Sequence, residues 1–339
     1  AASGDSCRMG IAARLEKDRI IGLILPTGAL HRSALHLDST GRRVLSRLLA
    51  EGVLRSRWNV VHLPDADPAV IAARRLRGLL TCTSALAHYG LPDILPVGVP
   101  HVAVPANRGR MESEGVVVHR EPGLVVGGEL FVPPERLLAR LLRCGPEKET
   151  IAVVDSALNH HLVTREEIAA LLTGKRNDCP RARRRLGRCT ERARSSIESI
   201  ARIELQDAGH LVESGVMVPG VGELDNFVDR ILDLETDGFA YHSSYSAWMR
   251  DRQRDQALLA RGLLPLRLTY DDVMAGRTVS LVEAALAGFG RRNGALGGSF
   301  GWAPAGPVAL SAESCGNRRA RPMLRPERSS QSAKTRRPQ

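Results

Sequence analysis

Apolar residues in the first part of the chain fit a helix followed by a short hairpin. Ser39 and Thr40 are typical N-cap residues, and Gly52 ends the helical pattern. The apolar face of this helix consists of Val44, Leu45, Leu48 and Leu49. The segment 53–62 is typical of a β-hairpin or wing. Since a helix followed by a wing ends a winged helix-turn-helix, we predict a partial one over residues 26–64, preceded by a weakly ordered leader over residues 1–25.

The segment 65–174 alternates between helical and strand-like patterns. Helices are predicted over residues 68–77, 83–89, 134–142 and 149–159, and Thr164 opens a further helix with a capping-box sequence. Short β-branched runs predict strands at residues 101–105 and 115–120. This region is therefore expected to be a mixed α/β domain, and its pattern contains no visible reaction chemistry.

The segment 195–288 shows the strongest alternation. We predict helices over residues 195–208, 246–261 and 279–286, and strands over 223–230, 231–237 and 264–268. Their order along the chain is αββαβα. From residue 289 to residue 339, Gly, Pro, Ser and Arg dominate, so we predict a disordered basic tail.

Composition and charge add a partner class to this picture. The chain has 339 residues, is 43% hydrophobic and carries a formal net charge of +11, with 48 Lys and Arg against 37 Asp and Glu. The excess lies in two segments, residues 175–194 and 291–339. We interpret 175–194 as a basic linker whose Arg183, Arg184 and Arg185 bind DNA phosphates. The alternative is a solvated segment that binds nothing in particular.

Cysteine usage and hydropathy bear on the compartment and on metal binding. No apolar stretch is long enough for a transmembrane helix, so we expect no membrane partner and a cytoplasmic protein. The cysteines are Cys7, Cys82, Cys144, Cys179, Cys189 and Cys315. None forms a Cys-x-x-Cys pair or lies beside a suitable His pair in the sequence. Free thiols are therefore expected, and no structural zinc site.

Acidic residues concentrate on two of the predicted strands. Alternation places Asp233, Glu235 and Asp237 on one face of the strand over 231–237. If the strands over 223–230 and 231–237 are antiparallel neighbours, Asp225 of the first and Glu235 of the second approach one another. Two hard carboxylates at a strand end are a plausible site for Mg²⁺, with Mn²⁺ as a substitute, and such an ion activates water for attack on a phosphodiester. The acid of the preceding helix, Glu198, is by itself equally typical of a surface salt bridge.

The combined order of these motifs resembles a known family. Three short motifs come first in the chain: Gly222-Glu223-Leu224-Asp225, Leu234-Glu235-Thr236-Asp237-Gly238 and Tyr241-His242. They are followed by Trp248, Asp251, Arg254-Asp255, Leu258, Gly262 and Arg267. This order resembles a C-terminal domain of actinobacterial proteins that is similar to the very-short-patch repair endonucleases, within the PD-(D/E)XK restriction-endonuclease-like superfamily. The resemblance implies a three-layer α/β domain with a mixed sheet over residues 195–288.

The same resemblance implies roles for individual residues. Asp225 and Glu235 would bind the metal, Glu198 would be the accessory acid of the helix, and Asp237 would stand where many members have Lys. His242 would be an auxiliary catalytic or phosphate-contacting group. Arg254 and Arg267 would support the site or touch DNA. The absent Lys and the acid at Asp233, a position that is usually apolar, depart from the family pattern.

The N-terminal half resembles a second family. Three segments are similar to AbiEi-type antitoxins: residues 45–64, residues 72–90 and the run Gly115-Val116-Val117-Val118-His119-Arg120. This resemblance implies an antitoxin-like α/β domain over residues 65–174, DNA binding, transcriptional autoregulation and a cognate toxin as partner. Three functions therefore stay open: an Mg²⁺-dependent DNA endonuclease, a non-catalytic DNA-binding regulator with a degenerate nuclease fold, and a protein-interaction partner of a toxin. The sequence does not indicate an oligomeric state.

Overall fold

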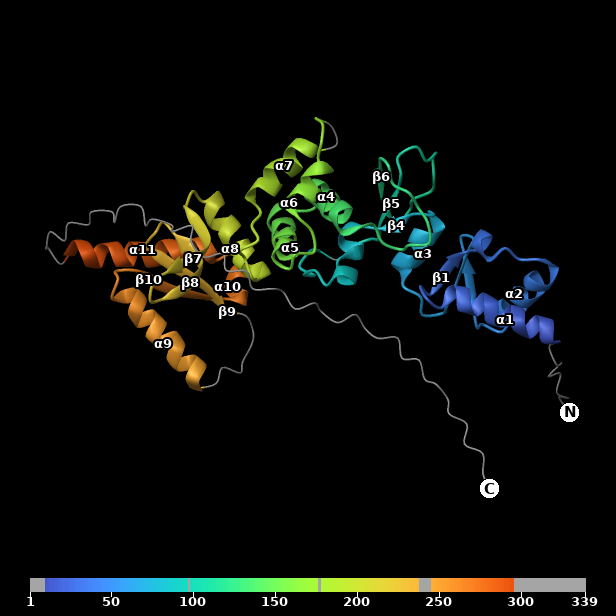
Figure 1. Ribbon diagram of the computed structural model, residues 1–339, viewed down its shortest axis with the longest axis horizontal. Helices are drawn as coiled ribbons and strands as arrows, with labels where there is room; N and C mark the ends of the chain where they lie inside the picture. Colours follow the sequence, from blue (N-terminus) through green and yellow to red (C-terminus); the bar gives the residue numbers. More distant parts are fainter. Residues whose placement is uncertain (1–9, 97, 176–177, 238–244, 296–339) are drawn as a thin grey trace, which may run out of the picture. The chain divides into compact units, whose positions relative to one another are not determined.

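The structure is a computed structural model that describes residues 10–96, 98–175, 178–237 and 245–295, without the side chains of 237, 245–248 and 291–295. The chain divides into two units, residues 1–292 and 293–339. Apart from the end of the last helix, all described elements belong to the first unit (Figure 1). The described elements form three β-sheets and three clusters of buried apolar residues, and the β1-β3-β2 sheet contributes residues to two of these clusters. The protein is therefore a mixed α+β fold, as the sequence predicted.

The N-terminal region contains a complete helix–hairpin arrangement. Its elements are α1 (Ile11–Ile24), β1 (Ala29–His31), η1 (Arg32–Leu35), α2 (Ser39–Ala50), β2 (Arg55–Arg57) and β3 (Val60–His62), and its sheet has the order β1-β3-β2. The predicted hairpin is confirmed. The predicted leader is wrong for residues 11–24, because Ile20 and Ile24 of α1 are fully buried against α2. The helix that precedes the wing is capped by Asp38, whose carboxylate accepts from the Gly41 amide at 2.7 Å.

The middle region packs short strands against helices. It contains α3 (Pro68–Arg75), β4 (Leu79–Leu80), η2 (Cys82–Ala85), η3 (Ala87–Tyr89), β5 (His101–Pro105), β6 (Val117–Glu121), α4 (Pro134–Cys144), α5 (Glu147–Asn159) and α6 (Arg165–Ala170). β5 pairs antiparallel with β4 and parallel with β6. The capping box predicted at Thr164 is present, with reciprocal bonds to Glu167. Residues 83–89 form two short 3-10 helices rather than one α-helix.

The segment expected to be a basic linker is a packed helix. α7 (Cys179–Arg188) lies against α4 and α5, and Ala182 and Leu186 are buried in the core of the middle region. Arg185 is also buried, and it donates to the carbonyls of Leu142 and Gly145 at 3.0 and 2.9 Å. The linker prediction was wrong because the segment forms an amphipathic helix. Some of its arginines donate to backbone carbonyls instead of remaining in solvent.

The C-terminal region is a four-stranded mixed sheet between helices. Its elements are α8 (Ser196–Asp207), β7 (Val212–Val218), β8 (Gly222–Val228), β9 (Leu232–Asp237), α9 (Tyr245–Leu259), β10 (Leu264–Thr269), α10 (Tyr270–Met274) and α11 (Thr278–Ala295). The strand order is β10-β9-β8-β7, with the β10–β9 pair parallel and the other two antiparallel. The sequence predicted β8, β9, α9 and β10 but missed β7.

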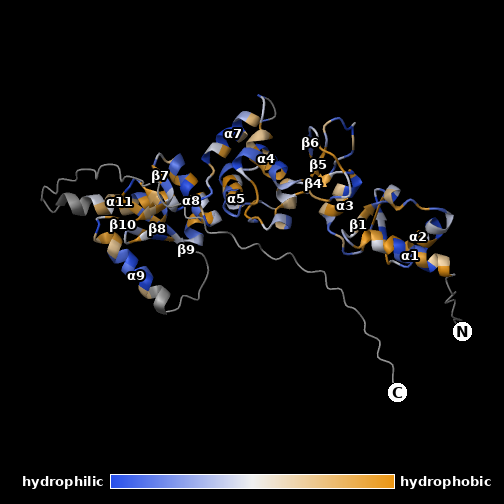
Figure 2. Cartoon of the chain, viewed as in Figure 1, coloured by the Kyte–Doolittle hydropathy of each residue, from blue (hydrophilic) through white to orange (hydrophobic). Residues whose placement is uncertain are grey.

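The two faces of this sheet differ in chemistry. Leu232 and Leu234 of β9 are fully buried and belong to an apolar cluster with α8, α10 and α11. The alternate residues Asp233 and Glu235 face α9, which is hydrophilic along most of its length (Figure 2). The prediction that alternation separates acids from leucines on β9 is confirmed. The acids therefore project from a strand whose position is fixed by the opposite, apolar face.

A buried ion pair links α8 to α5. Asp155 of α5 accepts from Arg202 at 2.7 Å, from the Ser199 hydroxyl at 2.6 Å and from the Thr190 amide at 2.7 Å. Asp155 and Arg202 are both nearly inaccessible to solvent. Burial raises the pKa of Asp155, and Arg202 opposes that shift. Because α8 begins close to the acids of the C-terminal sheet, this link also fixes the position of those acids.

No helix in the described parts of the chain is both long enough and apolar enough to cross a membrane.

Candidate functional site

The register of two antiparallel strands brings the predicted acids together. Asn226 pairs with Leu234, and Phe227 pairs with Asp233. Continuing this register by one residue sets Asp225 of β8 opposite Glu235 of β9 on the same face of the sheet. Glu235 also contributes to the raised pKa of Asp225, although less than burial and Glu198 do. The register and this electrostatic contribution agree with the expected approach of Asp225 and Glu235.

Glu235 is held by two arginines. Its Oε1 pairs with Arg254 Nη1 of α9 at 2.6 Å, and its Oε2 pairs with Arg267 Nε of β10 at 2.8 Å. Arg254 also donates to the Glu223 carbonyl at 2.7 Å, and Arg267 bridges to Asp255 of α9 at 3.0 Å. Both arginines, predicted to support the site or touch DNA, are partly buried within the acidic cluster. Their described contacts orient Glu235.

Asp225 carries a raised pKa of about 6. The largest cause is burial, followed by repulsion from Glu198 and then from Glu235, while Arg254 and Arg194 act in the opposite direction. Glu198 is buried at the first turn of α8, where its Oε2 accepts from the Arg194 amide at 2.8 Å. Glu198 thus contributes both a helix-capping bond and negative charge beside Asp225.

Asp233 lies deeper in the same cluster. Its side chain has no solvent exposure, its Oδ2 lies 3.3 Å from Arg254 Nη2, and its Oδ1 has no hydrogen-bond partner. Burial, and next the charge of Glu235, raise the pKa of Asp233 to about 7. The sequence prediction of an acid on this face is correct. Burial of this carboxyl group therefore favours its neutral, protonated form.

The cluster has the donor chemistry that a hard divalent cation requires. The four acids Glu198, Asp225, Asp233 and Glu235 face three arginines, Arg194, Arg254 and Arg267, so the acids outnumber these cations by one. An unpartnered buried oxygen and a raised carboxyl pKa are both expected where a cation would relieve repulsion. The residues therefore fit Mg²⁺ in donor type and charge. Binding through Glu235 requires one of its oxygens to exchange an arginine for the ion.

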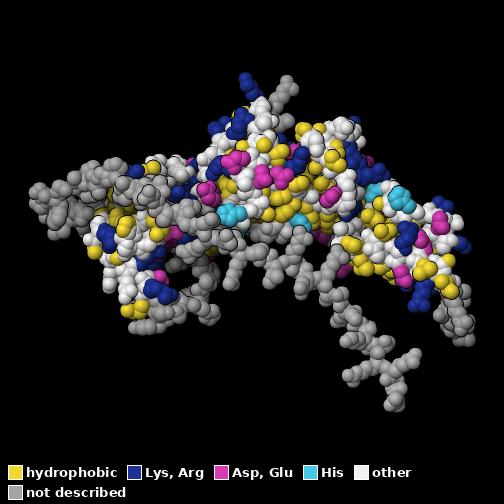
Figure 3. Space-filling model, viewed as in Figure 1, with side chains coloured by type: hydrophobic (Ala, Val, Ile, Leu, Met, Phe, Trp, Pro, Cys, Tyr) yellow, Lys and Arg dark blue, Asp and Glu magenta, His cyan; other side chains and the backbone are white. Residues whose placement is uncertain are grey.

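The remaining predicted site residues fall into two groups. Asp237 ends β9, where its backbone pairs with Thr269, and its side chain is outside the described residues; His242 lies in the segment 238–244, also outside them. Of the three arginines predicted to bind DNA, Arg185 is buried and bonded inside the chain. Arg183 is exposed but donates to the Leu172 and Gly174 carbonyls at 2.5 and 2.9 Å, whereas Arg184 is exposed on α7. Lys and Arg side chains gather over α7 (Figure 3).

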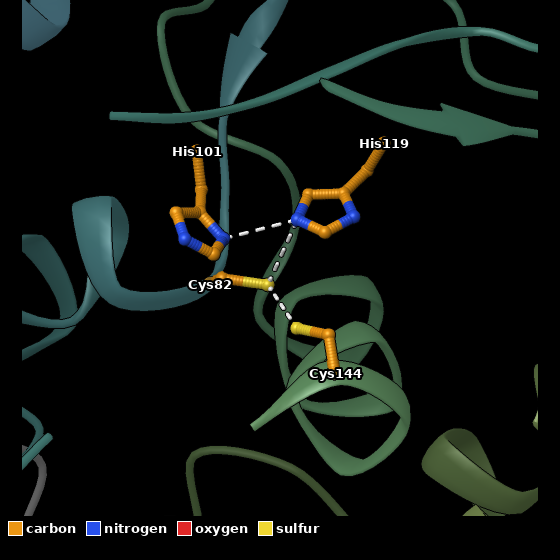
Figure 4. Close-up of side chains that lie close together, drawn as sticks. All are labelled: Cys82, His101, His119 and Cys144. Atoms are coloured by element: carbon orange, nitrogen blue, oxygen red, sulfur yellow. Dashed lines mark hydrogen bonds between the residues drawn. The ribbon is translucent and has the colours of Figure 1, made fainter. Parts of the chain in front are cut away.

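A second cluster, which the sequence did not predict, lies in the middle region. Cys82, His101, His119 and Cys144 point toward one another (Figure 4), and one ligand atom of each lies within 4.8 Å of all the others. Cys82 Sγ is 3.0 Å from Cys144 Sγ and 3.6 Å from His119 Nε2, which is 3.0 Å from His101 Nδ1. Cys82 and Cys144 thus lie beside two histidines in space, although no suitable His pair lies beside any cysteine in the sequence. Within the described residues this is the one group of three or more His, Cys, Asp or Glu side chains whose ligand atoms lie close enough together to hold an ion.

The N-terminal region of α2 and the β2–β3 hairpin carries a basic surface. Arg42, Arg43 and Ser46 are exposed on α2, and every residue of β2 is exposed. At the hairpin turn the Arg57 guanidinium lies 3.7 Å from the centre of the Trp58 ring. An exposed basic helix beside a wing with an arginine-stacked aromatic is suited to contacting a nucleic-acid backbone.

Comparison with known proteins supplies no family. No family model and no curated protein matches the sequence. Among solved structures, the Rv2827c protein from Mycobacterium tuberculosis is similar, with 17% sequence identity and a TM-score of 0.32. That match covers 51% of this chain and 76% of the other. A likeness of this extent carries no functional argument, so the function has to come from the residues described above.

Proposed function

We propose that this chain binds DNA and hydrolyses its phosphodiester bonds with Mg²⁺, or Mn²⁺ in its place, held by Asp225 and Glu235. The observation that carries the proposal is the β8–β9 register, because continuing it by one residue sets these two acids opposite each other on the polar face of the sheet. Carboxylate pairs of this kind are the usual protein ligands of Mg²⁺ at phosphoryl-transfer sites.

Each residue of the cluster has a distinct part in this proposal. Asp225 and Glu235 hold the ion, and Glu198 adds negative charge from the start of α8. Arg254 and Arg267 keep Glu235 on the polar face before the ion arrives. When bound, the ion would polarise the phosphodiester and activate a water molecule for attack.

A plasmid-nicking assay tests the acid pair. Wild type and the conservative variants Asp225→Asn and Glu235→Gln are compared with Mg²⁺, with Mn²⁺ and without divalent ions. Glu213→Gln is the matched control, because Glu213 is a partly exposed acid on β7 of the same sheet that pairs with Arg230. We expect each site variant to lower the nicking rate at least about 100-fold, since each removes a metal ligand.

The control should nick at the wild-type rate. Thermal unfolding of every variant confirms that a loss of nicking is not a loss of fold. Equal nicking by the wild type and both site variants would refute the role of Asp225 and Glu235, and a wild type that never nicks would refute hydrolysis.

A non-catalytic DNA-binding regulator is the second candidate, and the exposed basic surface of α2 and its wing favours it. Here we expect a gel shift at low salt that weakens steeply as salt rises, because bound phosphates release counterions. The double variant Arg42→Ala/Arg43→Ala should bind less DNA, whereas Arg14→Ala, an exposed arginine on α1, should bind like the wild type. DNA binding without nicking under any divalent ion would favour this candidate over the first.

A further inference from the structure

We propose that Cys82, His101, His119 and Cys144 form a binding site for one Zn²⁺ ion that cross-links the middle region of the fold. This set comprises two thiols and two imidazoles, whose ligand atoms all lie within 4.8 Å of one another. Two sulfurs and two nitrogens around one point are a common structural zinc ligand set. The site is separate from the carboxylates of the C-terminal sheet, and it does not depend on the proposed nuclease activity.

The spacing of the ligand atoms fits tetrahedral coordination. Zn–S bonds of about 2.3 Å and Zn–N bonds of about 2.0 Å set tetrahedral ligand atoms about 3.3–3.8 Å apart. The three contacts within the cluster measure 3.0, 3.0 and 3.6 Å, from Cys82 Sγ to Cys144 Sγ, from His101 Nδ1 to His119 Nε2 and from Cys82 Sγ to His119 Nε2. The ligand atoms lie up to 4.8 Å apart, so changes of up to about 1 Å in their separations would bring every pair to these spacings.

The backbone around the cluster presents these side chains. His101 begins β5 and His119 lies on the parallel neighbour β6, where Val117 is the partner of His101. His119 lies two positions after Val117, so both imidazoles project from the same face of the sheet. Ser84 Oγ accepts from the His101 amide at 2.9 Å, which ties the start of β5 to η2, where Cys82 lies.

Cys82 itself has an unfavourable backbone conformation. Its φ of 48° lies in the left-handed region, which costs a side-chain-bearing residue free energy. In this conformation the thiol, fully buried, points at His119 and Cys144. Strain at a buried cysteine that aims its sulfur at two other ligand groups is expected of a binding site rather than of simple core packing.

The donor chemistry selects zinc over the ions proposed for the C-terminal sheet. Mg²⁺ and Mn²⁺ favour oxygen ligands, whereas thiolates and imidazoles favour Zn²⁺. Two thiolates balance the charge of the ion, so a neutral unit can lie beside the apolar core of the middle region. Four protein ligands leave no open position for water, which indicates a structural role.

Such an ion would join segments that are far apart in the sequence. The ligands come from η2, β5, β6 and the last residue of α4, and Cys82 and Cys144 are separated by 62 residues. The strands of this sheet are short, β4 having two residues and β5 and β6 five each. A cross-link among four elements compensates for the small number of ladder hydrogen bonds that such strands form.

A disulfide between Cys82 and Cys144 is the competing arrangement. The sulfur atoms are 3.0 Å apart, and a disulfide bond would bring them to about 2.0 Å. A disulfide would leave the two histidines without a shared function, whereas zinc uses all four residues.

Metal analysis and cobalt substitution test the site on the full chain. Protein purified under reducing conditions is analysed for zinc by mass spectrometry, then stripped and titrated with Co²⁺. We expect one zinc per chain. The cobalt form should show the intense visible bands of tetrahedral Co²⁺ and a thiolate-to-cobalt charge-transfer band.

Two variants at the partly exposed side of the cluster keep the test independent of misfolding. Cys144→Ser and His101→Asn should each lower zinc content at least about tenfold and remove or shift the cobalt bands. Cys189→Ser is the matched control, since Cys189 is a buried cysteine of the same region that donates to the Arg185 carbonyl at 3.3 Å, a bond that serine retains. Zinc content in the control should equal that of the wild type.

Three results would overturn the proposal. The first is wild-type protein that holds no zinc and gives no charge-transfer band with Co²⁺. The second is equal zinc content in the wild type and in both site variants. The third is a Cys82–Cys144 disulfide, detected by peptide mapping, in protein that takes up no metal after reduction.

Discussion

The two polar clusters of this protein are built in opposite ways. The carboxylate cluster of the C-terminal sheet contains hard oxygen donors, and two arginines already bind both oxygens of Glu235. The Cys/His cluster of the middle region contains soft donors that contact one another. In the carboxylate cluster the acids repel one another and are stabilised by positive charge. In the Cys/His cluster the thiol and imidazole groups lie in contact with one another. The two proposals therefore assign an exchangeable ion to the carboxylate cluster and a resident ion to the Cys/His cluster.

The clusters also differ in what fixes them. Asp233 and Glu235 are positioned by Leu232 and Leu234, which pack the opposite face of β9 into an apolar core. The Cys/His cluster joins very short strands, so an ion there contributes directly to the stability of the fold. Removal of the metal should therefore lower the thermal stability at the Cys/His cluster and the nicking activity at the carboxylate cluster.

The largest expected effect is on thermal stability. Removal of zinc by a chelator that is selective for it over magnesium should lower the Tm of the wild type by at least about 10 °C, because structural zinc binding contributes to the free energy of folding. Removal of Mg²⁺ alone should stop nicking and shift the Tm by at most about 2 °C, since a weakly bound ion stabilises little. Differential scanning fluorimetry measures both shifts.

This comparison fails if the two treatments give equal Tm shifts. It also fails if the zinc-selective chelator leaves the Tm of the wild type unchanged while zinc is shown to have left the protein.

A smaller effect is expected from Asp233→Asn. Its folded pKa of about 7 exceeds the value of about 4 in an unfolded chain, so the folded state binds the extra proton between these pH values. The stability that this proton supplies is complete below about pH 4 and is lost as pH rises through about 7. Without divalent ions, the amide should raise the free energy of unfolding by roughly 2–4 kcal/mol at pH 8 and change it little at pH 4.

Urea unfolding at pH 4, 6 and 8 measures this dependence. Glu213→Gln, which alters an exposed ion pair, should change the free energy of unfolding by less than about 0.5 kcal/mol at every pH. A variant Asp233→Asn that is less stable than the wild type at pH 8 would show that the Arg254 contact outweighs the burial of the charge.

The smallest effect is expected from Arg267→Lys. Lysine keeps the positive charge but cannot bridge Glu235 and Asp255 with a planar fork, and the pair is partly solvated. The free energy of unfolding should fall by about 0.5–1 kcal/mol, against no measurable change for Arg230→Lys at an exposed pair. A loss above about 2 kcal/mol would mean that Arg267 supports the whole carboxylate cluster.

The carboxylate cluster was predictable because its chemistry is local. Asp225 and Glu235 lie on consecutive strands, so alternation and a single turn suffice to bring them together. The two-faced character of β9 follows from the same alternation. The ion pairs of Glu235 were not predictable in the same way, since they need the register of β10 on β9 and the placement of α9.

The Cys/His cluster was not predictable from spacing. Its ligands come from four elements, and no pair has the separation that defines a familiar metal motif. The only local signals were a cysteine just after the two-residue strand β4 and two histidines at the ends of short β-branched runs. Similarly, Gly215, with a φ of 64°, interrupts the apolar pattern of β7 and concealed that strand. The helix α7 was missed because its arginines bind backbone carbonyls of neighbouring helices.

The Asp155–Arg202 pair has a consequence for anyone who wishes to dissect the chain. A fragment that starts at residue 195 would retain Arg202 and Ser199 but lose the acid to which both are bonded. An inward-facing guanidinium without its carboxylate costs about 3–5 kcal/mol, comparable to much of the stability of a small domain. Recombinant fragments of the C-terminal sheet should therefore include α5, or replace Arg202 with an apolar residue of similar length.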